Sequence, residues 1–394
     1  MAEKLSQEEL KELKAAYETG NLTGAAAKLQ EELESLEKIP LDIAITGESG
    51  SGKSSFVNAI RGLGDEDEDE GAAKTGEVET TKYPKAYPHP LLPNVTVWDL
   101  PGIGTPSFQA DKYLKQVNFS CYDFFIIIAS ERFTYHHITL AREIHKMGKR
   151  FYYVRSKVDA DLYAAQTRRP STYNDMRILQ GIRDNCIKNL REAGEVSPRV
   201  FLICSWNWDK YDFPLLQETL ENELDDQKRH AFILALPNIS TKILEKKKAE
   251  LKKHIWKLAL VSGAIAVIPV LGLSFACDVA ILMVNMKRYL TAFGLDDNSL
   301  TRLARQVDKP VAELKSVIKA VPLANSISKE WVVSLLSKSA CGAVMIAEEA
   351  LDLIPVVGSL LSGGVSFGTT YYMLNSFLND AAKDAQNVLA KALS

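Results

Sequence analysis

Residues 41–60 read LDIAITGESGSGKSSFVNAI, a segment in which an apolar run meets a glycine-rich loop. Its first part, 41–46, has the composition of a buried strand, and 54–60 continues as a helix. The pattern between them is G-x-x-x-x-G-K-S, and a strand–loop–helix context is what a phosphate-binding P-loop requires. The alternative is a flexible Gly/Ser hinge, which the position at the start of an α/β pattern disfavours.

Such a loop would hold phosphate with its main chain. Its glycines let N–H groups converge on an anion, and the following helix adds its positive N-terminal end. Lys53 would contact the β- and γ-phosphates, and Ser54 would ligate Mg²⁺. The predicted phosphate-binding residues are Gly47, Glu48, Ser49, Gly50, Ser51, Gly52, Lys53, Ser54 and Ser55.

The composition is that of an ordinary globular protein. Of 394 residues, 46% are hydrophobic and 25% charged, which leaves room for two or three domains. A net charge of −3 gives no general basic surface for nucleic acid. The five cysteines lack metal-ligand spacing and are expected to be buried thiols in a reducing compartment. Because MAEKLSQEEL carries neither a signal-peptide pattern nor a glycine at the second position, we expect a cytoplasmic protein.

Short apolar runs alternate with amphipathic helices from residue 41 to about residue 224. This pattern predicts a mostly parallel sheet covered on both faces, in an α/β domain spanning 39–224. Segments 1–38 and 225–394 read as helices, and the acidic run at 65–70 reads as a solvated loop. The later strand-like runs are VTVWD (95–99), DFFIIIAS (123–130), RFYYVRSKVD (150–159) and RVFLICS (199–205).

The motif WDLPGIG, 98–104, closes the run VTVWD. Asp99 would reach the Mg²⁺ shell through water, and the N–H of Gly102 would sense the γ-phosphate. Ras-type GTPases place a glutamine directly after this glycine to orient the attacking water. Because Ile103 stands there instead, another group must position the water, or hydrolysis is very slow.

The motif RSKVD, 155–159, indicates guanine recognition. Asp159 would accept hydrogen bonds from N1–H and the 2-amino group of guanine, which adenine does not offer, so an ATP-using enzyme is disfavoured. Lys157 would lay its aliphatic stem over the base. Ser156 replaces the usual asparagine of N-K-x-D, and taken alone the motif is equally consistent with a surface turn.

Two further segments carry candidate ligands. In TGEVETTKYP, 75–84, a switch threonine should bind Mg²⁺, and spacing does not choose among Thr75, Thr80 and Thr81. In CSWNWDKYDFPLL, 204–216, the amides of Cys204 and Ser205 should line the base pocket. Trp206 and Trp208 would either pack on the base or fill core, and core is favoured.

In this order the motifs resemble the immunity-related GTPase family, the interferon-inducible, dynamin-like GTPases. The resemblance spans essentially the whole chain, including FGLDDNSLTRLARQV (293–307), and ADKYLKQVNFSCYDFF (110–125) is especially similar to one lineage of the family. Lys53 assigns the chain to the branch with glycine-lysine-serine in the loop. The family implies a Ras-like α/β P-loop GTPase domain plus an all-α domain formed from N- and C-terminal segments.

The resemblance also implies residue roles. Lys53, Glu79 and Gly102 would serve hydrolysis, with Glu79 acting once two GTPase domains pair across their nucleotides. Ser54, Thr81 and Asp99 would hold Mg²⁺, and Lys157 and Asp159 would bind guanine. Family members commonly carry Ser-Asn where this chain has Cys204 and Ser205.

A long apolar stretch, 258–284, carries one charged residue, Asp278, and is long enough to cross a bilayer. Pro269 and Gly272 divide it into two pieces, each the length of a core helix. We expect core packing, with reversible contact to an intracellular membrane as the alternative. The stretch 353–372 is treated alike, and its IPVVG echoes IPVLG at 268–272.

Two functions fit these features. The first is a GTPase that converts GTP to GDP with Mg²⁺, assembles into a homodimer or oligomer through its GTPase domain, and associates peripherally with membranes. The second is a GTP-gated scaffold with negligible hydrolysis, which the absence of glutamine at Ile103 favours.

Overall fold

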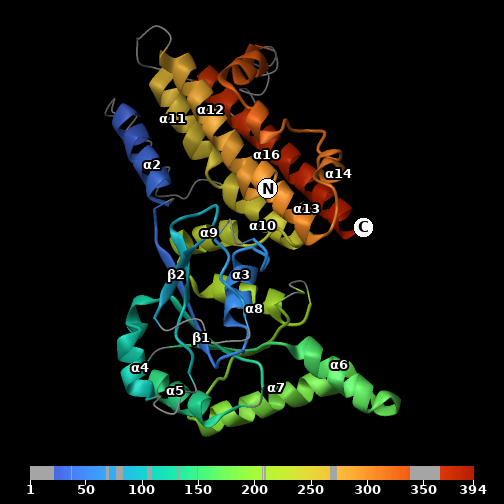
Figure 1. Cartoon of the computed structure of the whole chain (residues 1–394). Helices are drawn as coiled ribbons and strands as arrows, with labels where there is room; N and C mark the ends of the chain where they lie inside the picture. The colour runs from blue at the N-terminus through green and yellow to red at the C-terminus, as the bar shows by residue number, and fades with distance from the viewer. Residues whose placement is uncertain are drawn as a thin grey trace. The chain divides into compact units, whose positions relative to one another are not determined.

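The computed structural model describes residues 22–36, 38–67, 71–76, 83–103, 109–131, 133–148, 150–205, 207, 210–266, 273–337 and 364–394 (Figure 1). The chain forms two compact units. The sheet unit runs from Ile39 to Ile239, and the helical unit combines the described residues before Ile39 with those from Ser240 onward. This confirms an α/β domain and a helical domain built from both ends of the chain.

The sheet unit contains a six-stranded sheet in the order β2-β3-β1-β4-β5-β6. All neighbouring strands are parallel except β2, which runs antiparallel on the edge. The strands are β1 (Leu41–Gly47), β2 (Lys85–Pro88), β3 (Val95–Asp99), β4 (Phe124–Ala129), β5 (Tyr152–Arg155) and β6 (Val200–Leu202). Sequence analysis missed β2, because in KAYP only Tyr87 is buried and no apolar run marks the strand.

Helices cover both faces of this sheet, as predicted from its apolar strands (Figure 1). Helices α4, α5 and α7 share one apolar core with the sheet, and α3, α8 and α9 pack elsewhere on the strands. The helices are α3 (Lys53–Ile60), α4 (Ala110–Gln116), α5 (Tyr135–Lys146), α6 (Val158–Arg168), α7 (Asp175–Glu192), α8 (Phe213–Glu223) and α9 (Asp226–Ala235), with 3₁₀ turns η2 (Phe119–Cys121) and η3 (Pro170–Thr172).

The sheet unit extends past residue 224 because α9 belongs to it. The Phe232 ring of α9 lies 6.3 Å from that of Phe124 in β4. Residues 231–235 are buried, which gives α9 a wide apolar surface. The helix therefore completes the cover of the sheet and does not begin the helical unit.

The helical unit resolves the long apolar stretch into two helices, as its Pro and Gly predicted. In α11 the residues 259–264 are buried, which favours the core interpretation. None of the helices in the described ranges combines the length and apolarity needed to cross a bilayer. The helices are α2 (Leu22–Leu36), α10 (Thr241–Lys252), α11 (Ile255–Ala266), α12 (Leu273–Ala292), α13 (Asp297–Gln306), α14 (Val311–Lys315), η4 (Ala324–Ser326) and α16 (Gly364–Leu393), and 329–337 is also helical. The pentapeptides at 268–272 and 354–358 lie outside the described residues, as does the segment before residue 22.

Two expectations need correction. The acidic run is not simply solvated, because Asp67 is 3% exposed and accepts a hydrogen bond from Gly64 N–H at 2.8 Å. The thiols are not uniformly buried either. Cys186 and Cys204 are buried, whereas Cys121 is exposed and Cys277 is intermediate.

Candidate functional site

The parallel strands bring the predicted motifs to one edge of the sheet, the carboxyl edge. Gly47 pairs with Ile128, and Ile45 pairs with Asp99, so β1, β3 and β4 end together. The ends of β5 and β6 join them through the pairing of Arg155 with Leu202. Ligands of open α/β sheets bind at this edge, so the fold assembles the site.

The glycine-rich loop joins β1 to α3. A Cβ at Gly47 would lie 1.9 Å from the Ile128 carbonyl oxygen, so glycine is required there. Gly52 caps α3 with φ 89° and contributes no side chain, which leaves the first helical N–H groups to another acceptor. The exposed Ser49 and Gly50 complete the turn. The main chain therefore has the form that anion binding by a helix N-terminus requires.

Lys53 lies against this loop. Its Nζ donates to the Gly47 and Glu48 carbonyl oxygens at 3.2 and 3.0 Å, and the side chain is 9% exposed. Both acceptors belong to the loop itself. The ammonium is therefore held where a bound phosphate would meet it.

Ser54 and Asp99, two of the candidates for Mg²⁺, are adjacent. Ser54 Oγ donates to Asp99 Oδ2 at 3.3 Å, and Asp99 is 1% exposed at the end of β3. A hydroxyl and a carboxylate are hard oxygen donors, so their chemistry fits Mg²⁺. The described residues contain no cluster of three or more His, Cys, Asp or Glu that could hold a metal without further help.

Ile103 belongs to the core. Its side chain is 2% exposed, and its N–H donates to the Gly47 carbonyl oxygen at 3.0 Å. The position that carries glutamine in Ras-type enzymes is therefore used for packing. Nearby, Tyr113 OH bonds Thr46 Oγ1 at 2.5 Å and the Pro101 carbonyl oxygen at 2.9 Å, which ties the D-x-x-G loop to α4. Gly102, whose main-chain N–H is the predicted contact to the γ-phosphate, is partly exposed in the same loop.

Ser156, which replaces the usual asparagine of N-K-x-D, connects two parts of the site. Its hydroxyl donates to the Ser51 carbonyl oxygen at 2.6 Å, so the end of β5 is bonded to the phosphate loop. Lys157 has φ 56° and donates from Nζ to the Gly50 carbonyl oxygen at 2.8 Å. Asp159 follows in the first turn of α6 and is partly exposed.

The β6 end supplies the remaining candidates. Cys204 is 1% exposed, and Ser205 is partly exposed. The N–H of Val158 donates to the Ile203 carbonyl oxygen at 3.3 Å, which brings the β6 end beside the start of α6. Tyr211 is partly buried against the core of the sheet unit, and burial raises the pKa of its hydroxyl. Sequence analysis gave no signal for Tyr211.

The Glu48 side chain bonds to another residue of the chain, Thr134, a contact that the sequence did not suggest. Its Oε1 accepts from Thr134 Oγ1 at 2.5 Å, and Thr134 caps α5. Burial lowers the pKa of His137 to about 4, and Nδ1 of the neutral ring accepts from Thr134 N–H at 3.1 Å. The Glu48 carboxylate thus anchors the loop to α5 through Thr134 and a neutral histidine. Only the TYHH pattern at the helix start hints at it.

Some predicted residues lie outside the described ranges. They are Glu79, Thr80, Thr81, Trp206 and Trp208. Ser55 is partly buried on α3, and Thr75 is exposed ahead of the switch segment.

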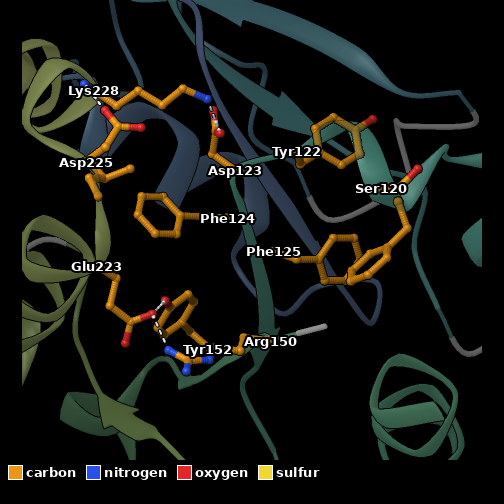
Figure 2. Close-up of a pocket in the computed structure, with 12 residues that line it drawn as sticks. Ser120, Tyr122, Asp123, Phe124, Phe125, Arg150, Tyr152, Glu223, Asp225 and Lys228 are labelled. Atoms are coloured by element: carbon orange, nitrogen blue, oxygen red, sulfur yellow. Dashed lines mark hydrogen bonds and ion pairs between the residues drawn. The ribbon is translucent and has the colours of Figure 1, made fainter. Parts of the chain in front are cut away.

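A cavity lies at the opposite, amino end of the sheet, where β4 and β5 begin (Figure 2). The cavity measures about 320 Å³. Lys228 pairs with Asp123, and both Tyr152 and Arg150 reach Glu223. Because these charges satisfy one another and the predicted phosphate- and guanine-binding motifs lie at the other edge, the carboxyl edge is the better candidate site.

Comparison with known proteins agrees with this geometry. Residues 6–392 match the model of the family described as interferon-inducible GTPase. The chain is 49% identical over 389 residues to interferon-inducible GTPase 5 of Rattus norvegicus, covering 99% of this chain and 83% of the relative, and the Bos taurus protein of that name gives the same values. It is 40% identical over 387 residues to interferon-gamma-inducible GTPase 10 of Mus musculus, covering 98% and 90%. The chain therefore belongs to the interferon-inducible GTPase family and is a GTPase.

Proposed function

We propose that the carboxyl edge of the sheet binds GTP together with Mg²⁺, and that hydrolysis to GDP and phosphate is fastest when two chains pair through their GTPase domains. The observation that carries the proposal is the Ser54–Asp99 contact of 3.3 Å beside a Lys53 bonded to the loop. The hydrogen bonds of the chain itself hold these groups in place, which is the arrangement that electrostatic catalysis needs.

Each group has a role in this scheme. The loop amides and the Lys53 ammonium stabilise negative charge that develops on the transferred phosphoryl group. The oxygens of Ser54, Asp99 and Thr81 would hold Mg²⁺, which when bound neutralises charge on the phosphate oxygens. Asp159 reads the guanine edge, and Lys157 covers the base.

Pairing of two chains would supply the water-orienting group that is missing at Ile103. Because that side chain is buried and has no hydrogen-bonding group, it cannot orient the attacking water. Glu79, assigned by family resemblance, would do so when two GTPase domains pair across their nucleotides. Turnover per molecule should then rise with protein concentration.

The test measures specific GTPase activity over a wide dilution series. We expect Glu79→Ala to keep GTP affinity and to lose the rise in turnover, while Glu77→Ala in the same segment, the control, keeps both. A flat dilution series, or a Glu79→Ala variant with wild-type turnover, would refute this scheme.

A GTP-gated scaffold with negligible hydrolysis is the second candidate, and the buried Ile103 favours it. Single-turnover measurement at high protein concentration separates the two, since a scaffold would leave GTP intact for hours. The helical unit would then contact a partner or the surface of an intracellular membrane, peripherally from the cytoplasm. Phe275 and Val284 of α12, which are 49% and 60% exposed, support such contact.

A further inference from the structure

Arg155 is a buried cation and the first residue of the RSKVD motif, 155–159, which is predicted to bind guanine. It is the last residue of β5 and is 6% exposed. Its Nη1 donates to the carbonyl oxygens of Ser130 and Ser156, the latter at 2.8 Å, and its Nη2 donates to Asp161 Oδ2 at 2.6 Å. The guanidinium therefore bonds the ends of β4 and β5 to the first turns of α6.

Asp161 and Asp159 are two positions apart on α6. Successive helical residues turn by about 100°, so the two carboxylates project in nearly opposite directions around the axis. Holding Asp161 on Arg155 therefore fixes the direction in which Asp159 projects. A rotation of α6 that released Asp161 would turn Asp159 away from its present direction.

The Arg155–Asp161 ion pair adds a charged contact to the apolar contacts that hold α6 in the sheet unit. The helix buries Val158 and Leu162, and its first residue is preceded by Lys157 in the left-handed conformation without a side-chain cap. Burial raises the pKa of Asp161, Arg155 opposes that rise, and the charges of Asp159 and Glu131 add to it. The Arg155 guanidinium thus favours the charged form of the Asp161 carboxylate.

We infer that Arg155 and Asp161 form a positioning pair that aims the Asp159 carboxylate at the guanine edge and so sets purine selectivity. This inference rests on the proposed role of Asp159. The pair contacts the nucleotide through no group of its own. Its loss should therefore change the discrimination between purine bases more than the affinity for phosphates.

The experiment compares the affinities of the purified full chain for GDP and IDP, with Mg²⁺ present. IDP lacks the 2-amino group, one of the two donors that Asp159 would accept. In Asp161→Asn we expect the preference for GDP over IDP to fall about tenfold, the size of one lost hydrogen bond to a charged group, because GDP loses its bonds from both N1–H and the 2-amino group whereas IDP loses only the one from N1–H. Asp161→Glu, which keeps the charge, should recover part of the preference.

The control is Asp123→Asn, which removes the charge from the Lys228–Asp123 pair at the opposite end of the same sheet. It should leave the GDP-to-IDP ratio unchanged even if it lowers the melting temperature. If Asp161→Asn keeps the wild-type ratio, or weakens GDP and IDP equally, the positioning inference is overturned and the role of Asp159 stands. If the wild type does not prefer GDP, or Asp159→Asn keeps the preference, both are overturned.

Discussion

The two units bury polar side chains in different places. In the sheet unit, Lys53, Asp99 and Ser156 lie at the carboxyl edge and bond loops that surround the predicted ligand. In the helical unit, buried charges complete contacts between helices, as when Asp384 on α16 accepts from three successive N–H groups, 319–321. Similar burial therefore lies beside the proposed binding site in one unit and supports internal stability in the other.

A second cluster in the helical unit follows the same rule. Asp278 of α12 is 8% exposed, and burial raises its pKa while two serine hydroxyls oppose the rise. Ser262 Oγ donates to its Oδ1 at 2.5 Å, and Ser366 Oγ donates to its Oδ2 at 3.0 Å. The charge in the long apolar stretch thus joins α11, α12 and α16.

The largest effect should come from Lys53→Ala. Loss of the ammonium removes charge-assisted hydrogen bonds to phosphate, so GTP affinity should fall by about a hundredfold or more. Fluorescent-nucleotide titration measures this, with Lys146→Ala on the exposed face of α5 as the control. A variant that binds GTP as tightly as the wild type would show that the nucleotide does not bind at the carboxyl edge.

Asp384→Ala should instead act on stability. Three main-chain N–H groups lose their acceptor in a site where Asp384 is 1% exposed, so the free energy of unfolding should drop by about 3 kcal/mol. Urea unfolding of the variant measures it, and Lys383→Ala on the exposed side of α16 serves as the control. GDP affinity should stay at the wild-type value, and a parallel loss of binding would break the distinction between the units.

Lys247 gives a smaller, pH-dependent effect. The side chain is 2% exposed and donates from Nζ to the Ala292 carbonyl oxygen at 2.9 Å, at the end of α12. Burial lowers its pKa from 10.5 to about 7, so between these values the unfolded chain binds more protons than the folded chain. Stability should therefore rise with pH in this window, by about 2 kcal/mol from pH 7 to pH 9 relative to Lys247→Met. Thermal unfolding at both values checks the sign, and a wild type that gains nothing over the variant would contradict it.

The sequence predicted what depends on local pattern. The strand–loop–helix segment, the later apolar strands and the split of the long apolar stretch all carry short-range signals, and the structure confirms them. The edge strand β2 and the packing of α9 on the sheet depend on tertiary contacts instead. The acidic run was expected to be solvated, but Asp67 is buried and accepts a hydrogen bond from the main-chain N–H of Gly64. Counting charges does not anticipate such a bond.

The candidate site divides in the same way. The motif positions predicted that Lys53, Ser54, Asp99 and Asp159 follow the carboxyl ends of strands. Parallel pairing of those strands brings the ends to one edge of the sheet. The bonds from Ser156 to Ser51 and from Thr134 to Glu48 join residues 105 and 86 positions apart, so they follow from sheet register. The local pattern of a single sequence is not enough to predict such register.

The central claim is that a guanine nucleotide binds at this carboxyl edge with Asp159 reading its base. The most direct test measures the affinities of wild type and Asp159→Asn for GDP and XDP, whose 2-position carries an acceptor in place of the amino donor. The wild type should prefer GDP, and Asp159→Asn should prefer XDP because an amide can donate where a carboxylate can only accept. A variant that keeps the wild-type preference for GDP would contradict the account.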